Sequence, residues 1–278
     1  MRRILLSIVL GAFVYAGSNA QQDPRFSQFM FTQMTVNPGA TGISGNYCGT
    51  FLYRNQWLGF DGSPSTALVQ LEAPIDVISS GAGLTFYYDQ LGFETNLVLR
   101  AQYAYHLTLG VGKLGMGLGL GFAQKAFNAD WNPIDPVSQD QYIPGEQESQ
   151  GSFDMSLGFY YEQREFFAGI SSTHLTGQAL DKVNMDVARH YWITGGYNFY
   201  NVVANLDLTP SILAKSDIAE TQLDFNVMAK YHMGNNTLFG GVSYRFKDAV
   251  APMLGYTVKM PGGETSGDKF LSFGVAYD

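Results

Sequence analysis

The sequence predicts an all-β protein, a transmembrane antiparallel β-barrel of a bacterial outer membrane, and three observations support this prediction. Residues 113–122 alternate large apolar side chains with glycine, and a strand places successive side chains on opposite faces. Segments with the same period of two recur along most of the chain, and none of them is a long apolar run. Charged residues make up only 14% of the chain and aromatic residues 14%, which suits a wall that faces lipid.

Residues 1–20 are predicted to be a secretory signal peptide. Two arginines precede an apolar core over residues 4–16, and small residues at 18–20 fit a cleavage site. The core is too short and too close to the terminus for a good spanning helix, although a retained anchor is the alternative. We expect the mature chain to begin at Gln21.

Residues 21–46 are predicted to form an N-terminal segment in the periplasm or the barrel lumen. Asp23 and Pro24 suit the N-cap and first position of a helix, and Asn37-Pro38 ends the apolar pattern that follows. The pattern predicts a short amphipathic helix over residues 24–35. The alternative is an extended arm along the barrel interior.

The barrel itself is predicted over residues 47–278, with apolar positions toward lipid and charged positions toward the lumen. Each candidate strand is near the ~10 residues that a tilted crossing requires. The thirteen candidates are 47–57, 65–73, 81–90, 94–106, 113–124, 152–162, 165–174, 188–199, 202–213, 221–232, 237–246, 249–259 and 268–277.

The number of candidate strands is odd, whereas single-chain bacterial barrels normally have an even number. The sequence also ends at Tyr277-Asp278 without a terminal aromatic residue. We therefore expect a fourteen-strand barrel of which about thirteen strands are present here, open between the first and last strands. If the N-terminus is periplasmic, the long connections 125–151 and 175–187 both lie on the outer side, as is usual.

Two features are candidate partner-binding sites. Gly115, Gly117, Gly119 and Gly121 would look into the lumen, where they either leave room for a plug or a bound peptide or permit strong local curvature. Trp131-Asn132, in the long acidic connection, would form a contact tip for a partner.

No pattern predicts catalysis, a metal site or a cofactor. The four histidines are scattered over four predicted strands, and the single cysteine excludes an internal disulfide. A net charge of −8 without a Lys/Arg cluster argues against nucleic acid as a partner. A Ser/His pair on the outer wall of a lipid-modifying enzyme remains an alternative.

Several motifs stand out, at residues 21–31 and 36–42, at Arg54-Asn55-Gln56-Trp57 and at residues 241–245. Together they resemble the PorP/SprF family of type IX secretion-system membrane proteins. The resemblance covers nearly the whole mature chain. Gly39 departs from it, because the family often has alanine there. The matching residues include Asp23, Pro24, Phe26, Ser27, Gln28, Asn37, Pro38, Arg54, Gln56, Trp57, Tyr244 and Arg245.

The resemblance implies a non-enzymatic outer-membrane barrel that acts in type IX secretion and, in some bacteria, gliding motility. Its implied partners are secretion-ring lipoproteins or a large secreted adhesin, whose C-terminal domain it would help secrete or hold at the cell surface. This hypothesis predicts a lumen blocked by residues 24–35. The alternative, a passive channel for small solutes, predicts an open lumen.

Overall fold

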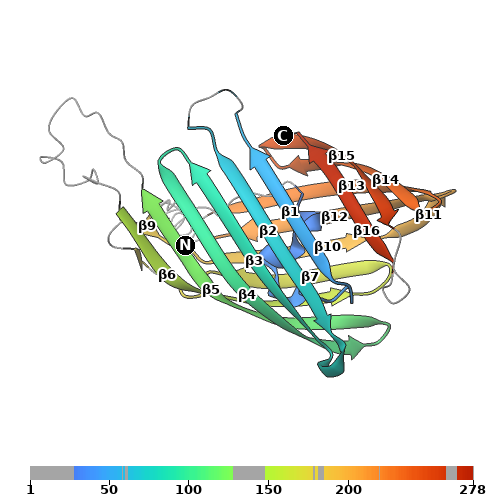
Figure 1. Cartoon of the computed structure of the whole chain (residues 1–278), viewed down its shortest axis with the longest axis horizontal. Coiled ribbons are helices and arrows are strands. Elements are labelled where there is room, and N and C mark those ends of the chain that lie inside the picture. Colours follow the sequence, from blue (N-terminus) through green and yellow to red (C-terminus); the bar gives the residue numbers. More distant parts are fainter. Residues whose placement is uncertain are drawn as a thin grey trace, which may run out of the picture.

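One antiparallel sheet forms the wall of the molecule and curves around a short N-terminal segment (Figure 1). The computed structural model describes residues 28–277 except 58, 60–61, 128–147, 178, 181–184, 219 and 261–267. Neighbouring strands follow one another along the chain, joined by long antiparallel ladders such as those of β5. This arrangement confirms the predicted all-β barrel fold.

The strands of the wall are tilted and of unequal length (Figure 1). They are β1 (Cys48–Asn55), β2 (Ser65–Ile75), β3 (Ser80–Leu91), β4 (Glu94–Leu109), β5 (Gly112–Phe127), β6 (Glu148–Glu162), β7 (Phe166–Thr173), β10 (His190–Tyr197), β11 (Phe199–Val203), β12 (Leu206–Ser216), β13 (Thr221–Met233), β14 (Asn236–Arg245), β15 (Ala249–Met260) and β16 (Lys269–Ala276). A separate two-stranded sheet joins β8 (Ala179–Leu180) to β9 (Met185–Asp186).

The sheet contains fourteen strands, and β1 and β16 stand at its two ends. Because β10 and β11 follow each other and both pair with β12, they form one crossing, which leaves thirteen crossings. An odd number of alternating crossings makes β1 and β16 run in the same direction. Among the described residues no ladder joins these two strands, so the predicted opening between first and last strands is confirmed.

One predicted boundary is wrong. The sequence places a turn at residues 200–201 and a strand over 202–213, whereas residues 199–203 continue the preceding crossing and β12 begins at Leu206. Asn205 makes the turn with a φ of 64°, a left-handed conformation that asparagine tolerates better than most residues. A register shift in the ladder between β11 and β12 accommodates the longer crossing.

The two ends of the wall differ in their connections. We call the end that carries the connections 128–147 and 174–189 the long-loop end. The opposite end carries turns such as 110–111, 163–165 and 204–205, and we call it the short-turn end. The antiparallel order therefore places both long connections at one end, as the sequence predicts.

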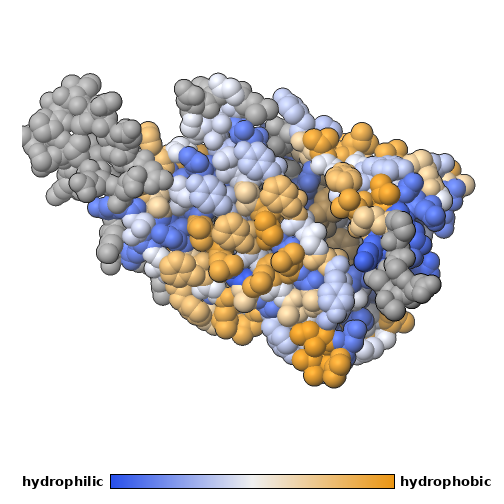
Figure 2. Space-filling view, viewed as in Figure 1, coloured by the Kyte–Doolittle hydropathy of each residue, from blue (hydrophilic) through white to orange (hydrophobic). Residues whose placement is uncertain are grey.

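The outer face of the wall is apolar. Met116, Leu118 and Leu120 of β5 are each exposed, while the glycines between them are buried. Apolar side chains gather in patches over the strands on the visible face (Figure 2). Among the described residues, no helix has the length and hydropathy needed to cross a membrane.

The N-terminal segment lies inside the wall as a series of short helical turns (Figure 1). They are η2 (Phe29–Phe31), α2 (Gln33–Val36) and η3 (Pro38–Ala40). A further turn, η4 (Asp76–Ile78), joins β2 to β3. We call residues 28–43 the plug, because nearly all residues from Thr32 onward are buried.

The plug differs from the predicted helix over 24–35, of which residues 24–27 lie outside the described part. No continuous helix forms, because Thr32 has φ −127° and ψ 33° and interrupts the turns. Several backbone carbonyls beyond this point accept hydrogen bonds from the wall, so they are satisfied without further helical bonds. The segment thus lies within the lumen, as the arm alternative predicts, but it is coiled rather than extended.

Candidate functional site: the plug and the two halves of the lumen

The plug rests on glycines of β5 and β6. A Cβ atom added at Gly115 or Gly117 would overlap the backbone of Gly39 or Pro38. A Cβ atom at Gly39 would lie 2.8 Å from Gly115 O, closer than real Cβ contacts come. The absence of these side chains therefore lets two stretches of backbone meet directly.

Asn37 fastens this contact. Its Nδ2 donates to Phe159 O (3.0 Å), and its Oδ1 accepts from the backbone N of Gly39 (2.9 Å). Only 1% of Asn37 is exposed, and a Cβ at Gly158 would overlap its side-chain oxygen. Asn37 thus satisfies a wall carbonyl and fixes the turn that brings Pro38 and Gly39 to the wall.

Polar side chains of the wall bond mainly the backbone of the plug. An amide, a guanidinium and an imidazole of β4 and a hydroxyl of β7 each meet a plug carbonyl. The contacts join Gln102 Nε2 to Met34 O (2.6 Å), Arg100 Nη1 to Thr35 O (3.2 Å), Ser171 Oγ to Val36 O (2.7 Å) and His106 Nε2 to Thr41 O (2.9 Å).

Two further contacts come from β2. Glu72 Oε2 accepts from the backbone N of Gly42 (2.7 Å), and Gln70 Nε2 donates to the hydroxyl of Thr35 (2.8 Å). On the opposite wall, Phe29 and Val36 pack with Trp192 of β10 and Leu213 of β12. The plug therefore contacts the wall on several sides and fills the middle of the lumen.

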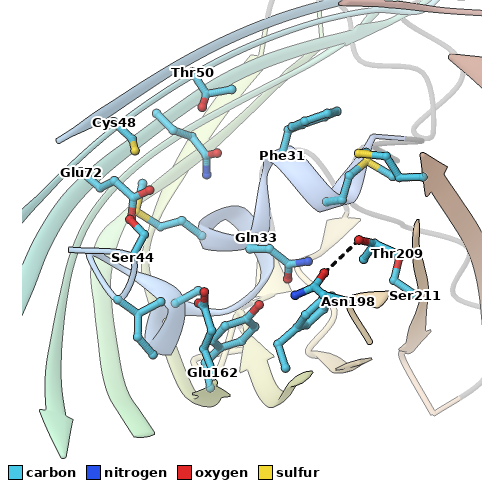
Figure 3. A pocket seen from close by; sticks show the side chains of 18 of the residues that line it. Phe31, Gln33, Ser44, Cys48, Thr50, Glu72, Glu162, Asn198, Thr209 and Ser211 are labelled. Carbon is cyan, nitrogen blue, oxygen red and sulfur yellow. Dashed lines mark hydrogen bonds between the residues drawn. The ribbon is translucent and has the colours of Figure 1, made fainter. Parts of the chain in front are cut away.

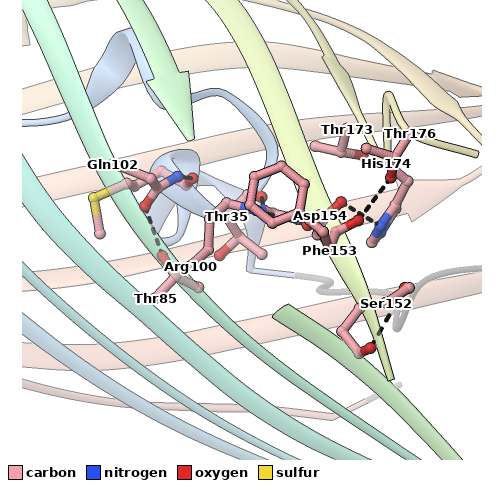
Figure 4. A network of polar contacts seen from close by, with 12 residues as sticks. Thr35, Thr85, Arg100, Gln102, Ser152, Phe153, Asp154, Thr173, His174 and Thr176 are labelled. Carbon is pink, nitrogen blue, oxygen red and sulfur yellow. Dashed lines mark hydrogen bonds and ion pairs between the residues drawn. The ribbon is translucent and has the colours of Figure 1, made fainter. Parts of the chain in front are cut away.

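On the long-loop side of the plug, a buried ion pair joins β4 to β6 (Figure 4). Arg100 Nη2 and Nε donate to Asp154 Oδ2 at 2.5 and 3.1 Å, and both side chains are almost fully buried. The other oxygen of Asp154 lies 3.0 Å from Nδ1 of His174, which begins the connection to β10. Asp154 therefore links Arg100, which donates to Thr35 O, to the start of a connection at the long-loop end.

This polar layer continues across the lumen. His174 meets His190 edge-on with 5.9 Å between ring centroids, and His190 is 6.1 Å from the ring of Trp192. Lys215 Nζ lies 5.2 Å from the centre of the Trp192 ring, a cation–π distance. The layer thus extends from β4 to β12 above the plug.

On the short-turn side, a cavity of about 320 Å³ lies between the plug and the wall (Figure 3). Its lining combines apolar side chains of the plug with carboxylate, amide and hydroxyl groups of the wall. The lining includes Met30, Gln33, Met34 and Ile43 of the plug, Glu72 of β2, Glu162 of β6, Ser211 of β12, and Asn226, Met228 and Lys230 of β13.

Comparison with known protein families decides what kind of barrel this is. The model of a type IX secretion system membrane protein family, PorP/SprF, matches residues 18–278. The chain belongs to the PorP/SprF family. Family and β-barrel fold together place the protein in the outer membrane.

Other comparisons add little to the PorP/SprF assignment. No curated protein matches the chain. Among solved structures, outer membrane phospholipase A from Escherichia coli is similar with a TM-score of 0.37 and 12% identity, over 83% of this chain and 88% of that one.

The PorP/SprF motifs fall in different parts of the fold. Asn37 and Pro38 form the plug contact described above, and Gln28 is the first described residue of the plug. Arg54, Gln56 and Trp57 lie at the long-loop end of β1, whereas Tyr244 is exposed on the outer face of β14. Arg245 is buried and lies 2.9 Å from Asp248 and 3.8 Å from Asp224. Asp23, Pro24, Phe26 and Ser27 lie outside the described residues.

The candidate partner-binding residues are not brought together. Gly115 and Gly117 contact the chain's own plug, whereas added Cβ atoms at Gly119 and Gly121 would meet Arg100. The row of glycines therefore makes room for the plug in one half, and in the other half for Ser156, the backbone of β4 and the aliphatic part of Arg100. Trp131 and Asn132 lie outside the described residues, and partner binding at all six positions stays a prediction.

The sequence analysis missed Asp154, His174 and Ser171 as site residues. The signal that the sequence offers for the polar layer is the alternation of Arg100 and Gln102 with apolar residues along β4. His174 and His190 do meet, although they were assigned to separate strands. Within the described residues, no group of three or more His, Cys, Asp or Glu side chains could hold a metal ion.

Proposed function

We propose that this PorP/SprF protein is a non-enzymatic outer-membrane barrel that helps to secrete or anchor a partner protein of the type IX system. The partner is a secreted adhesin, held through its C-terminal domain at the long-loop end, or a lipoprotein of the secretion ring. The observation that carries this proposal is the plug. A lumen filled by a segment bonded to several strands does not suit free passage of solutes.

The nature of the plug contacts also supports this proposal. The wall binds carbonyls of a polypeptide backbone through Arg100, Gln102 and Ser171. Contacts of this kind support a lumen that accommodates a peptide chain rather than a hydrated small molecule. For the lipid-modifying alternative, a Ser/His/acid cluster would have to face lipid, whereas His106, His174 and His190 are buried on the lumen side. The exposed His232 contacts Asp207 and Thr237, but it lies beside the short turn that follows β13.

The test is a pull-down of the tagged full-length protein from detergent-solubilised outer membrane, followed by mass spectrometry. Recovery of a large secreted protein with a C-terminal sorting domain would support the anchor role. Recovery of secretion-ring lipoproteins would instead support a role within the machine. The absence of both, together with steady conductance of the unaltered protein in planar bilayers, would overturn the proposal in favour of a channel.

A further inference from the structure

Three residues that line the cavity on the short-turn side of the plug each carry a buried polar atom without a hydrogen-bond partner. Within the described residues, Gln33 Oε1, Ser211 Oγ and Asn226 Oδ1 are buried and make no hydrogen bond. Ser211 is 8% exposed and Asn226 2% exposed, and all three residues line the cavity. An unmet buried polar group costs about 1–3 kcal/mol, so three at one cavity are unusual.

The neighbouring polar groups do not share this feature. Thr209 lies on the same wall of the cavity and donates to Asn198 Oδ1 at 2.9 Å (Figure 3). Asn226 Nδ2 is also engaged, with Ser243 Oγ at 2.9 Å. The three atoms without a hydrogen-bond partner are therefore all oxygens, which accept hydrogen bonds from N–H or O–H donors.

The apolar and charged residues of the lining indicate which class of ligand fits the cavity. Met30, Met34 and Met228 offer flexible apolar surface, which adapts to side chains of different shape. Glu72 and Glu162 face the cavity against a single lysine, Lys230, and this balance disfavours anionic groups such as lipid phosphates. A fitting ligand thus carries several N–H donors, an apolar group and no negative charge.

An extended polypeptide meets all three requirements. The wall already binds polypeptide backbone on the plug, where Glu72 accepts from Gly42 N and Ser171 donates to Val36 O. A volume of about 320 Å³ is at the lower end of small-molecule sites (~300–1,000 Å³), so it suits only a short segment.

We propose that this cavity binds a short extended segment of a partner polypeptide that enters from the short-turn end. Its backbone N–H groups bond to Gln33 Oε1 and Ser211 Oγ, and one apolar side chain enters among the three methionines. The three oxygens are shielded from solvent in the observed arrangement. Rotation of the Ser211 hydroxyl and the Gln33 amide about their own side-chain bonds turns them toward the ligand.

The test uses the full-length protein in detergent micelles with ¹³C-labelled methionine methyl groups. The probe is N-acetyl-Ala-Leu-Ala amide, and the comparison probe is the same peptide with every backbone nitrogen methylated. We expect saturable shifts of the Met30, Met34 and Met228 signals with the first peptide, and at least tenfold weaker binding of the second. Met116, which is exposed on the outer face, reports partition into detergent.

Three variants sharpen the result. Ser211→Ala removes an unpartnered hydroxyl and should weaken binding about two- to tenfold, the equivalent of one hydrogen bond. Ser152→Ala, a buried serine on the other side of the plug, should leave binding unchanged. Thr209→Trp should fill the cavity and abolish the shifts. Heat-modifiable gel mobility checks that each variant forms a barrel.

Several results would overturn the proposal. Equal binding of both peptides would show an apolar cavity without backbone recognition. Shifts confined to Met116, or no shifts at all, would show that peptide does not enter. This site rests on the proposed function only in that both require a protein partner. The pull-down can therefore fail to show capture at the long-loop end while the methionine shifts are still observed.

Discussion

At the scale of single residues, glycine and asparagine decide where the plug sits. Pro38 and Gly39 approach the wall so closely that Gly115 and Gly117 have no room for a Cβ atom. Gly39 stands where the PorP/SprF family often has alanine. An alanine in this chain would need a shift of the wall or of the plug backbone.

We expect Gly117→Ala to displace the plug at a cost of about 1–3 kcal/mol, since the new methyl group overlaps Pro38 and Gly39. Hydrogen exchange of residues 34–43 should speed up accordingly. The matched control is Gly195→Ala on β10, where the added Cβ would lie 3.6 Å from its nearest neighbour, Phe167 O. Equal protection of the plug in both variants would contradict the direct backbone contact.

The buried ion pair permits a second prediction at this scale. Asp154→Ala leaves Arg100 charged and buried, which should lower the free energy of unfolding by about 3–5 kcal/mol. The double variant Arg100→Met with Asp154→Leu removes both charges and should recover much of this loss. Urea unfolding in lipid vesicles measures both. Similar loss in the single and double variants would show that shape rather than charge matters.

At the scale of elements, the plug is a short coiled segment held by the strands around it. Its turns are too short to be stable alone, so its conformation depends on bonds from Gln102, Arg100 and Ser171. The conformation of the plug thus depends on its contacts with the wall, whereas the strands of the wall pair mainly with each other.

Removal of residues 28–43 should open the lumen and raise conductance in planar bilayers many-fold above that of the unaltered protein. The strand ladders do not include these residues, so the barrel should still assemble and keep its heat-modifiable gel mobility. Unaltered protein that conducts as well as the deletion variant would mean that the plug does not close the pathway.

Whether the sequence predicts a feature depends on how far apart the interacting residues lie along the chain. Strands such as β5 and β13 are predictable because alternation is a local property of residues two apart. The turn at Asn205 was placed wrongly because residues 199–203 continue the apolar pattern beyond Asn198. The pairing of Arg100 with Asp154 joins residues 54 apart, and it depends on barrel curvature and register, which no short pattern encodes.

At the scale of the whole molecule, the wall separates lipid from a polar interior. Leu118 points outward from the middle of β5, while Gly117 and Gly119 beside it face the lumen. This alternation around the wall determines which substitutions the protein tolerates.

Leu118→Arg should reduce the free energy of folding into lipid vesicles by about 2–4 kcal/mol, because it places a charge against the hydrocarbon. Val111→Arg is the control, since Val111 is 87% exposed in a turn at the short-turn end and its substitution should cost little. If both variants fold equally well, residue 118 does not face lipid.

The two oxygens of Asp154 have a thermodynamic consequence. One is bonded to the arginine that donates to Thr35 O of the plug, and the other pairs with His174 at the start of a connection at the long-loop end. Consider a molecule that displaces His174 and thereby changes the affinity of the lumen for the plug. By thermodynamic linkage, the affinity of the barrel for that molecule changes by the same factor when the plug leaves. Under the proposed anchor role, the affinity for a partner at the long-loop end would depend on whether the plug occupies the lumen.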